Sequence, residues 1–232
     1  MKDISLKGCF YLLAIPPGLF ILLVGFLFLN FYDIHVRYRL TVEVQDGDQI
    51  KTGSSVIDAS YAIEPDWSPS GPHVHDPDIV GYAPTVDLGE KGMLFLTFER
   101  TPTATYVRER SKQIPCGFGV VGCLPFAAYN KPAIWSKRSE MKAPLYELLR
   151  QSGPRDVPFA MLPKLARFRD INEPLSLTPV SPNDLAAFGA GIQLKRVILQ
   201  LTNDRVSPLP ASWPQWLTKK GGTYDYDGIL FH

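Results

Sequence analysis

An uncharged apolar run near the N-terminus is followed directly by strictly alternating apolar and polar residues. No charged side chain occurs between Lys7 and Asp33, a stretch of 25 residues. As a helix this stretch would extend about 37 Å, at ~1.5 Å per residue, whereas the hydrocarbon core of a bilayer is about 30 Å thick. The sequence therefore predicts a transmembrane anchor over residues 8–32, behind a short N-terminal tail of residues 1–7.

The apolar run contains two prolines, Pro16 and Pro17, and each removes a backbone donor and clashes with the preceding turn. A helix counted only from Pro17 to Tyr32 would extend about 24 Å. Residues 9–15 are therefore expected to contribute to the crossing or to lie at the interface. The exit of the run, FLNFYDIH, lacks the small residues of a signal-peptidase site, so we expect the anchor to be retained.

The charges beside the run bear on orientation. Lys2 and Lys7 precede it and two arginines follow it, which nearly balances the positive-inside bias. Because the tail charges are closest to the run, we favour the tail inside and the domain outside; a domain facing the cytoplasm is the alternative. A disulfide between Cys116 and Cys123 would fit the outside, since such bonds persist in oxidising compartments. Two buried free thiols are equally ordinary.

The remaining residues, 33–232, predict a single α+β domain that is mainly antiparallel β with one or two short helices. Residues 34–44 alternate strictly, residues 55–63 alternate again, and Asp46-Gly47 lies between them, which predicts a long hairpin. Residues 80–88 and 93–99 predict a second hairpin. Residues 192–202 predict another long strand.

Helical signals are few. We expect residues 101–143 to be irregular and residues 145–151 to form a short helix that ends before Gly153-Pro154. A second brief helix is expected after Ser181 as its N-cap, ending at Gly189 or Gly191. The aromatic residues of the tail are expected to dock on the domain: Trp213, Trp216, Tyr224 and Tyr226.

The formal net charge of +1 conceals an asymmetry between the two halves of the domain. Residues 33–99 carry four Lys or Arg and twelve Asp or Glu, and residues 100–232 carry eighteen and ten. The halves could pack through complementary faces, the basic half could meet an anionic partner such as lipid head groups, or the surface could simply be mixed and solvated. The basic residues are dispersed among apolar ones, so nucleic-acid binding is not expected.

Two stretches in the middle of the chain raise binding hypotheses. Gly117, Gly119 and Gly122 match G-x-G-x-x-G, but nearby prolines leave no room for the helix of a dinucleotide site, and we expect no cofactor. Residues 113–130 are uncharged and flanked by lysines, which would suit a loop in the lipid head-group layer. A buried segment of the core is the alternative.

The stretch HVHDPD is the one cluster with metal-ligand residue types. His73 and His75 would share a face of an extended segment, and carboxylates could complete a divalent-metal site. Asp76 and Asp78 have the opposite parity, with Pro77 between them, so such a site would need a sharp turn or ligands from elsewhere. No nucleophile or phosphate-loop motif occurs, and catalytic residues are not identified.

Two further stretches, RYRLTVEVQDGDQIKTGSSVI and RFRDINEPLSLTPVSPNDLAAFGAGIQLKRVILQLTND, resemble a group of uncharacterised bacterial proteins. Members of that group carry an N-terminal membrane segment or export signal. The resemblance implies a bacterial source and a folded β-rich domain behind the anchor. The group has no assigned activity, so no functional residue is carried over from it.

These observations lead to one expectation about function. We expect a single-pass protein of the bacterial inner membrane, held in the bilayer by residues 8–32, with its domain on the periplasmic side of the cell envelope. Only Asp33 separates the anchor from the first strand, which favours a non-catalytic interaction or structural module that contacts another membrane or envelope protein. The alternatives are a membrane-tethered enzyme using His73 and His75, and a domain that binds lipid or a small ligand through residues 113–130.

Overall fold

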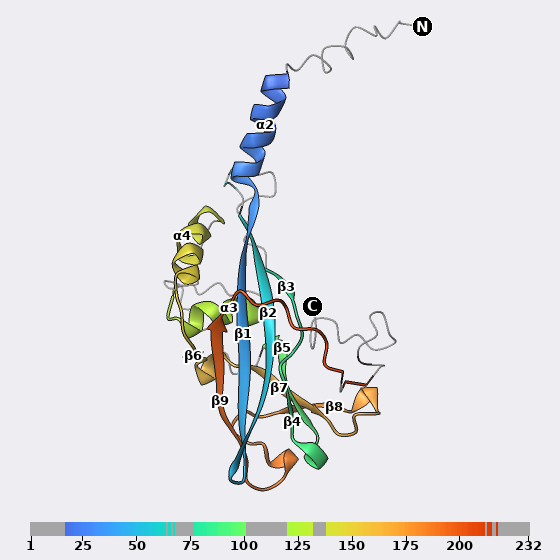
Figure 1. Ribbon diagram of the computed structural model, residues 1–232. Helices are drawn as coiled ribbons and strands as arrows, with labels where there is room; N and C mark the ends of the chain where they lie inside the picture. Colours follow the sequence, from blue (N-terminus) through green and yellow to red (C-terminus); the bar gives the residue numbers. More distant parts are fainter. Residues whose placement is uncertain are drawn as a thin grey trace, which may run out of the picture.

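The computed structural model describes residues 17–63, 65, 67, 77–100, 120–131, 138–211, 213, 214 and 217. Two antiparallel sheets form the body of this part, and one helix, α2, stands clear of them at one end (Figure 1). The helices are α2 (Pro17–Asn30), α3 (Val120–Ala128) and α4 (Arg138–Leu149). The strands are β1 (Tyr32–Asp46), β2 (Gln49–Ile63), β3 (Asp78–Val80), β4 (Thr85–Asp87), β5 (Met93–Arg100), β6 (Arg155–Asp156), β7 (Pro163–Phe168), β8 (Leu177–Val180) and β9 (Ile192–Leu201).

The alternating residues after the apolar run form β1, which pairs with β2 along its whole length. The register runs from Tyr32 opposite Ile63 to Asp46 opposite Gln49. Apolar positions on one face of β1 are buried, as period-two alternation predicts. Gly47 adopts φ +58° in the two-residue turn, a conformation that is costly for residues with a Cβ. The predicted hairpin is confirmed.

The first sheet has the order β3-β2-β1-β9-β6. Strand β9 is the long strand predicted near the C-terminus, and it is confirmed. It pairs with β1 only from Tyr38 to Asp46, so the first six residues of β1 extend beyond it. Figure 1 shows this upper part of the β1–β2 hairpin rising toward α2.

The second sheet has the order β4-β5-β7-β8 and lies against the inner face of the first. Strands β4 and β5 form the second predicted hairpin, with Thr85 opposite Phe95 and Asp87 opposite Met93. The prediction of a strand over residues 80–88 is confirmed only for Thr85–Asp87, because Val80 belongs to β3 and pairs with β2 in the first sheet. A 3-10 turn at Gly89–Lys91 joins them. Apolar side chains from both sheets and from α3 and α4 form one continuous core.

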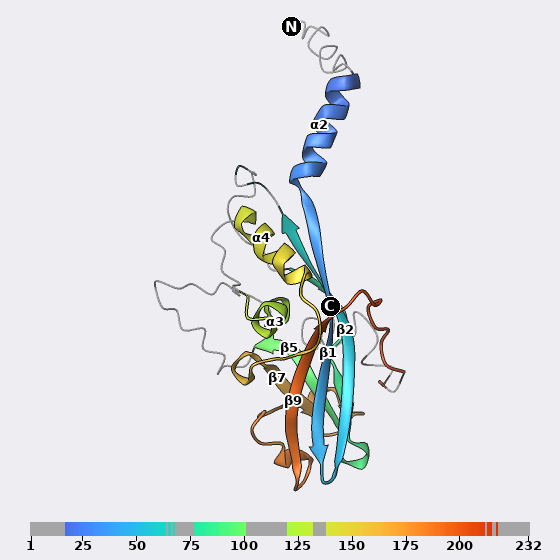
Figure 2. The same cartoon turned by 60° about the vertical axis from the view of Figure 1, so that its left-hand side comes forward.

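The expectation that residues 101–143 are irregular is wrong for two described parts of that range. Residues 120–128 form α3 despite Pro125, and α4 begins at Arg138 and continues through Pro144. The reason is burial: Leu124 and Phe126 of α3 are fully buried, and the gain from removing them from water outweighs the lost backbone bond. The helix predicted over residues 145–151 is thus the C-terminal part of a longer one (Figure 2).

The prediction of a brief α-helix that begins after Ser181 is also wrong. Ser181 accepts a hydrogen bond from the Asn183 amide and forms an isolated bridge with Asp184. The Asp184 carboxylate in turn accepts a bond from the Ala186 amide, and only Ala186–Phe188 are helical, as a 3-10 turn. Side-chain bonds to nearby amides therefore replace the helix with successive turns.

The described part of the C-terminal segment crosses the outer face of the first sheet and docks on the second. Trp213 is buried and packs edge-on against Tyr82, with ring centroids 5.5 Å apart. Leu217 is buried in the same cluster. Trp216, Tyr224 and Tyr226, which are also expected to dock, lie outside the described residues.

Among the described residues, no helix has the length and apolarity that would qualify it as a membrane span. Helix α2 contributes fourteen residues, Pro17–Asn30. Residues 8–16 of the predicted anchor lie outside the described part of the chain.

Candidate functional site

Helix α2 continues into β1 with a single residue between them. Phe31 lies between Asn30, the last residue of the helix, and Tyr32, the first of the strand. The Phe31 amide donates to the Leu27 carbonyl at 2.8 Å, and the Asn30 side chain donates to the Phe26 carbonyl at 2.7 Å. These bonds satisfy carbonyls in the last turn of the helix. The junction therefore contains no flexible linker, and the direction of α2 sets the direction of β1.

An aromatic side chain from beyond β2 packs against this junction. Trp67 stacks on Phe26 with ring centroids 5.9 Å apart, and it meets Phe31 edge-on at 5.7 Å. The Trp67 side chain nevertheless stays exposed, at 59%. It lies there because β2 runs antiparallel to β1 and so returns the chain to the helix end of the hairpin.

Helix α4 contributes two more side chains beside the junction. The Lys142 ammonium lies 5.3 Å from the centre of the Tyr32 ring. A hydrogen bond donated by the Lys142 ammonium to the Tyr32 oxygen raises the pKa of Lys142, and a hydrogen bond with Tyr32 raises the pKa of Tyr146. Together with the three aromatic residues above, these side chains lie beside the junction between α2 and β1. We call the set the aromatic collar: Phe26, Phe31, Tyr32, Trp67, Lys142 and Tyr146.

A charged cluster lies just below the collar on the outer face of the first sheet. Asp58 of β2 is nearly buried; it accepts from the Arg37 Nε at 2.9 Å and contacts the His35 Nδ1 at 3.2 Å. His35 and Arg37 both come from β1, and Arg37 is directly opposite Asp58. Each carboxylate oxygen of Asp58 thus has a partner. The arrangement compensates a buried charge and contains no nucleophile held by a base.

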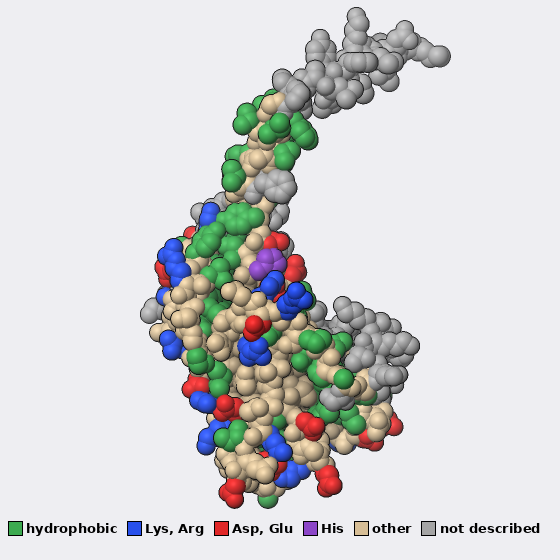
Figure 3. All heavy atoms as spheres, viewed as in Figure 1, with side chains coloured by type: hydrophobic (Ala, Val, Ile, Leu, Met, Phe, Trp, Pro, Cys, Tyr) green, Lys and Arg blue, Asp and Glu red, His purple; other side chains and the backbone are tan. Residues whose placement is uncertain are grey.

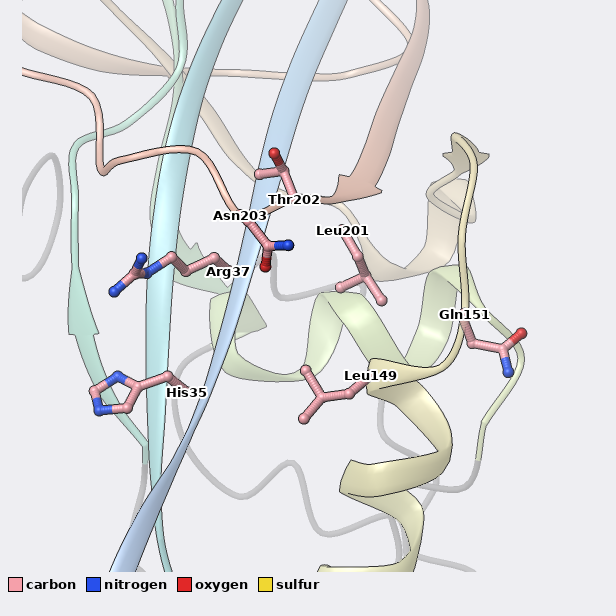
Figure 4. Close-up of a pocket in the computed structure, with 7 residues that line it drawn as sticks. All are labelled: His35, Arg37, Leu149, Gln151, Leu201, Thr202 and Asn203. Carbon is pink, nitrogen blue, oxygen red and sulfur yellow. The ribbon is translucent and has the colours of Figure 1, made fainter.

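A hollow of about 280 Å³ lies beside this end of β1 (Figure 4). The side chains of His35 and Arg37 point away from Leu149 and Gln151, which line the opposite side. The backbone of β1, rather than its side chains, therefore faces the hollow. Leu201, Thr202 and Asn203, at the end of β9, complete the lining. No set of chemically reactive side chains converges in this space.

A second hollow, of about 420 Å³, lies at the opposite end of the domain between the turn at Gly89–Lys91 and residues 167–171. Several of its polar side chains have structural partners. Asp87 accepts a hydrogen bond from the Gly89 amide, and Arg167 donates to the Ala187 carbonyl. Glu90 and Arg169 also line this hollow.

The metal-site hypothesis falls outside the described part of the chain, because His73 and His75 are not among its residues. Within the described residues, no group of three His, Cys, Asp or Glu side chains is placed to hold a metal ion. Cys123 is buried and forms a disulfide. Cys116 lies outside the described residues, so its pairing with Cys123 stays a prediction.

The glycine motif has a packing role at the one position that the structure describes. Helix α3 begins at Val120, inside the motif, and includes Gly122, contrary to the expectation that prolines leave no room for a helix. A Cβ on Gly122 would lie 2.3 Å from the ring of Pro77, and the Gly122 carbonyl accepts a hydrogen bond from the buried Tyr61 hydroxyl. The close approach explains why glycine stands there.

The described part of the uncharged stretch 113–130 is core. Leu124 and Phe126 are fully buried, and Phe126 packs edge-on against Tyr61 at 5.9 Å. These residues are not available to a head-group layer, which favours the core interpretation for the part of the stretch from residue 120 onward.

Ion pairs join the acidic and basic halves of the domain. Arg196 of β9 binds Glu43 of β1 at 2.8 Å, and Arg39 binds Asp204 at 2.8 Å. Glu43 is the main cause of the raised pKa of Arg196, and Arg39 is the main cause of the lowered pKa of Asp204. The first pair joins a cation of the basic half to a carboxylate of the acidic half, whereas the second joins a cation of the acidic half to a carboxylate of the basic half, so these contacts do not decide between the interpretations of the charge asymmetry.

The aromatic collar was not predicted from the sequence, although one signal for it was present. Tyr32 ends the uncharged run, and aromatic residues at the end of an apolar segment are typical of membrane interfaces. Trp67 and Tyr146 gave no such signal, because only the fold brings them to the junction.

Comparison with protein families, curated proteins and solved structures gives no match to the chain.

Proposed function

We propose that this chain is a single-pass protein of the bacterial inner membrane whose domain is a non-catalytic interaction module on the periplasmic side. The anchor would be residues 8–32. One observation carries the proposal: α2 passes into β1 through Phe31 alone. A domain joined in this way keeps a fixed position at the bilayer surface, which suits contact with another membrane or envelope protein.

The surface of α2 supports the anchor. Eight of its large apolar side chains are exposed, with Leu22 at 70% and Leu29 at 77%, and it has no charged residue. Figure 3 shows hydrophobic side chains along the helix and charged side chains only on the domain beyond it. A helix that is apolar all round needs an apolar environment, and lipid supplies one. Nine further uncharged residues, 8–16, precede it.

The aromatic collar supports a membrane surface at the end of α2. Tryptophan and tyrosine prefer the interface because one part of the ring is apolar and another part binds water, and lysine reaches lipid phosphates from the same depth. Trp67, Tyr146 and Lys142 would lie at that level if the helix crossed the bilayer. The exposed ring of Trp67 would then be covered by lipid.

The disulfide at Cys123 supports the periplasmic orientation, because structural disulfides form in oxidising compartments and are rare in the cytoplasm. The charged groups near the junction, Asp58 and Arg37, bind each other.

Protease treatment of spheroplasts tests the proposal. With the full chain in its own membrane, we expect external protease to degrade the domain while a cytoplasmic marker protein stays intact. A domain that survives in spheroplasts and is degraded only after lysis would place it in the cytoplasm and contradict the proposal. A matched variant, Leu22→Arg, places a charge in the middle of α2, and it should reduce the fraction of the chain that sediments with membranes.

A further inference from the structure

We propose that the backbone edge of β1 from Tyr32 to Val36 binds an extended segment of a second membrane or envelope protein, which adds a strand to the first sheet. The inference rests on the proposed function, because it names how the interaction module would hold its partner. The added strand would run antiparallel to β1 and lie in line with β9. Strand addition of this kind supplies affinity through main-chain hydrogen bonds.

Among the described residues, no strand covers this edge, because β9 is shorter than β1. Strand β2 pairs with all fifteen residues of β1, whereas the β9 ladder begins at Tyr38. One further bond, from the Thr202 amide to the Arg37 carbonyl at 3.0 Å, ends the pairing. The chain then turns away, since Asp204 binds both Thr202 and Arg39.

The backbone groups of two more residues point to this edge. In an antiparallel pair, successive residues direct their N–H and C=O groups to opposite sides. The two-residue turn makes Asp46 and Gln49 a bonded pair, so the even-numbered residues of β1 bond to β2. Asp33 and His35 therefore face the same side as Arg37, and no described residue forms a backbone hydrogen bond with either of them there.

The hollow of about 280 Å³ provides space for the added strand. It is lined by the β1 backbone at His35 and Arg37, by the end of β9, by Leu149 at the end of α4 and by Gln151 after it (Figure 4). Neighbouring strands lie about 4.8 Å apart, so a partner beside β1 would enter this space. Leu149 is 44% exposed and would form the wall on the inner face.

The two faces of the sheet define the chemistry of the segment. Ile34 and Val36 point inward, so partner residues opposite them would lie on the Leu149 side and are expected to be apolar. His35 and Arg37 lie on the outer face with exposed side chains, so the partner residue opposite His35 is expected to be acidic or to accept hydrogen bonds. The matching segment has about five residues, alternating in polarity.

The position of the edge indicates where the segment comes from. Tyr32 directly follows the junction with α2, so under the proposed function the edge begins at the bilayer surface. A partner strand there would belong to a protein that is itself at the membrane. Flat open edges pair readily with other chains, and a bound partner strand would protect this edge from such unspecific pairing.

Amide hydrogen exchange on the full chain in lipid nanodiscs, with one copy per disc, tests the inference. The amides of Ile34 and Val36 should be protected by β2, and those of Asp33 and His35 should exchange at least tenfold faster. The probe is the peptide Thr-Val-Glu-Val-Glu-Val-Thr. We expect it to slow exchange at Asp33 and His35 at least tenfold, whereas the same peptide with both glutamates N-methylated should not.

Two variants separate the backbone from the side chain. His35→Pro removes an edge donor without touching the β1–β2 ladder, and it should weaken peptide binding more than tenfold. His35→Ala keeps the donor and should bind within about threefold of the parent chain. Equal binding by both variants would contradict the inference, provided that both unfold at the temperature of the parent within a few degrees.

Other outcomes would overturn the inference. Slow exchange at Asp33 and His35 without peptide would mean that another segment of this chain covers the edge. Protection that appears only with two copies per disc would assign the edge to a second copy. No effect of millimolar peptide would show that the edge does not accept a strand. Alkaline extraction of membranes that contain the full chain reports on the anchor separately. It therefore distinguishes a failure of the proposed function from a failure of strand addition at this edge.

Discussion

Trp67 stacks on Phe26 with ring centroids 5.9 Å apart and planes 17° apart, which connects the segment after β2 to the last full turn of α2. The contact spans the junction between helix and domain. Together with the short connection through Phe31, it holds the helix in one direction relative to the sheet.

If this junction lies at a bilayer surface, Trp67 is accessible to lipid. In liposomes that contain lipids brominated near the head group, we expect the tryptophan fluorescence of the full chain to be quenched, and Trp67→Phe to remove most of that quenching. Trp213→Phe is the matched control, since Trp213 is 4% exposed and should contribute little. Quenching that is unchanged in Trp67→Phe would place the collar away from the lipid.

Gly53 permits the close approach of the two sheets. A Cβ at this position would lie 1.9 Å from the Thr85 carbonyl oxygen of β4, and the obstacle is backbone, which cannot rotate away. We expect Gly53→Ala to lower the free energy of unfolding by roughly 2–3 kcal/mol, as overpacking does. Urea denaturation measures it. Ser54→Ala, at the exposed neighbouring position, should change stability little, and equal effects of the two would contradict the packing argument.

Buried tyrosines predict a loss of stability at alkaline pH. Burial raises the pKa of both Tyr38 and Tyr61 above the ordinary value. A raised pKa in the folded state means that the unfolded chain loses the proton first, so stability is complete below about pH 10 and declines as the pH rises above it. Thermal unfolding between pH 8 and pH 11 should show this decline.

The substitution Tyr61→Phe separates the contribution of Tyr61 to the alkaline decline from that of Tyr38. It removes one titrating group, so the alkaline decline should be shallower than in the parent chain. At neutral pH it removes the hydrogen bond to the Gly122 carbonyl and should cost about 1–3 kcal/mol, because a buried acceptor is left without its partner. An unchanged alkaline slope would show that Tyr61 is not the group responsible.

The ion pair between Arg39 and Asp204 predicts a loss of stability at acid pH. Hydrogen bonds from Arg39 and Thr202 lower the pKa of Asp204. The stabilisation is present above the ordinary pKa of an aspartate and disappears as the pH falls through the lowered value. We expect the melting temperature of the parent to exceed that of Asp204→Asn at pH 7 and to approach it near pH 2. A difference that is independent of pH would exclude the ion pair as its source.

The β-sheet framework could be predicted because its strands have two unlike faces. The alternation from Ile34 to Val44 gave the first strand and the buried face, and residues 192–202 gave β9 in the same way. Helix α3 was missed because its residues are apolar on every side and include Pro125. Only burial between the sheets makes that segment helical, and burial is a property of the assembled fold.

The candidate site was less predictable, because its parts are distant in the sequence. Trp67 reaches Phe26 only because β2 returns along β1, and Lys142 reaches Tyr32 only because α4 packs beside the hairpin. The open edge of β1 depends on where β9 stops at Leu201, relative to a strand that begins at Tyr32. Alternation identifies a strand, but it does not show which neighbour covers each part of its edge.

The central claim is that residues 8–32 remain in the bilayer and hold the domain at its surface. Alkaline carbonate extraction of membranes that contain the full chain, combined with the intact mass of the extracted protein, tests it most directly. We expect the protein to stay in the membrane pellet with a mass that includes residues 1–32. Release into the supernatant, or a mature chain that lacks those residues, would contradict the account.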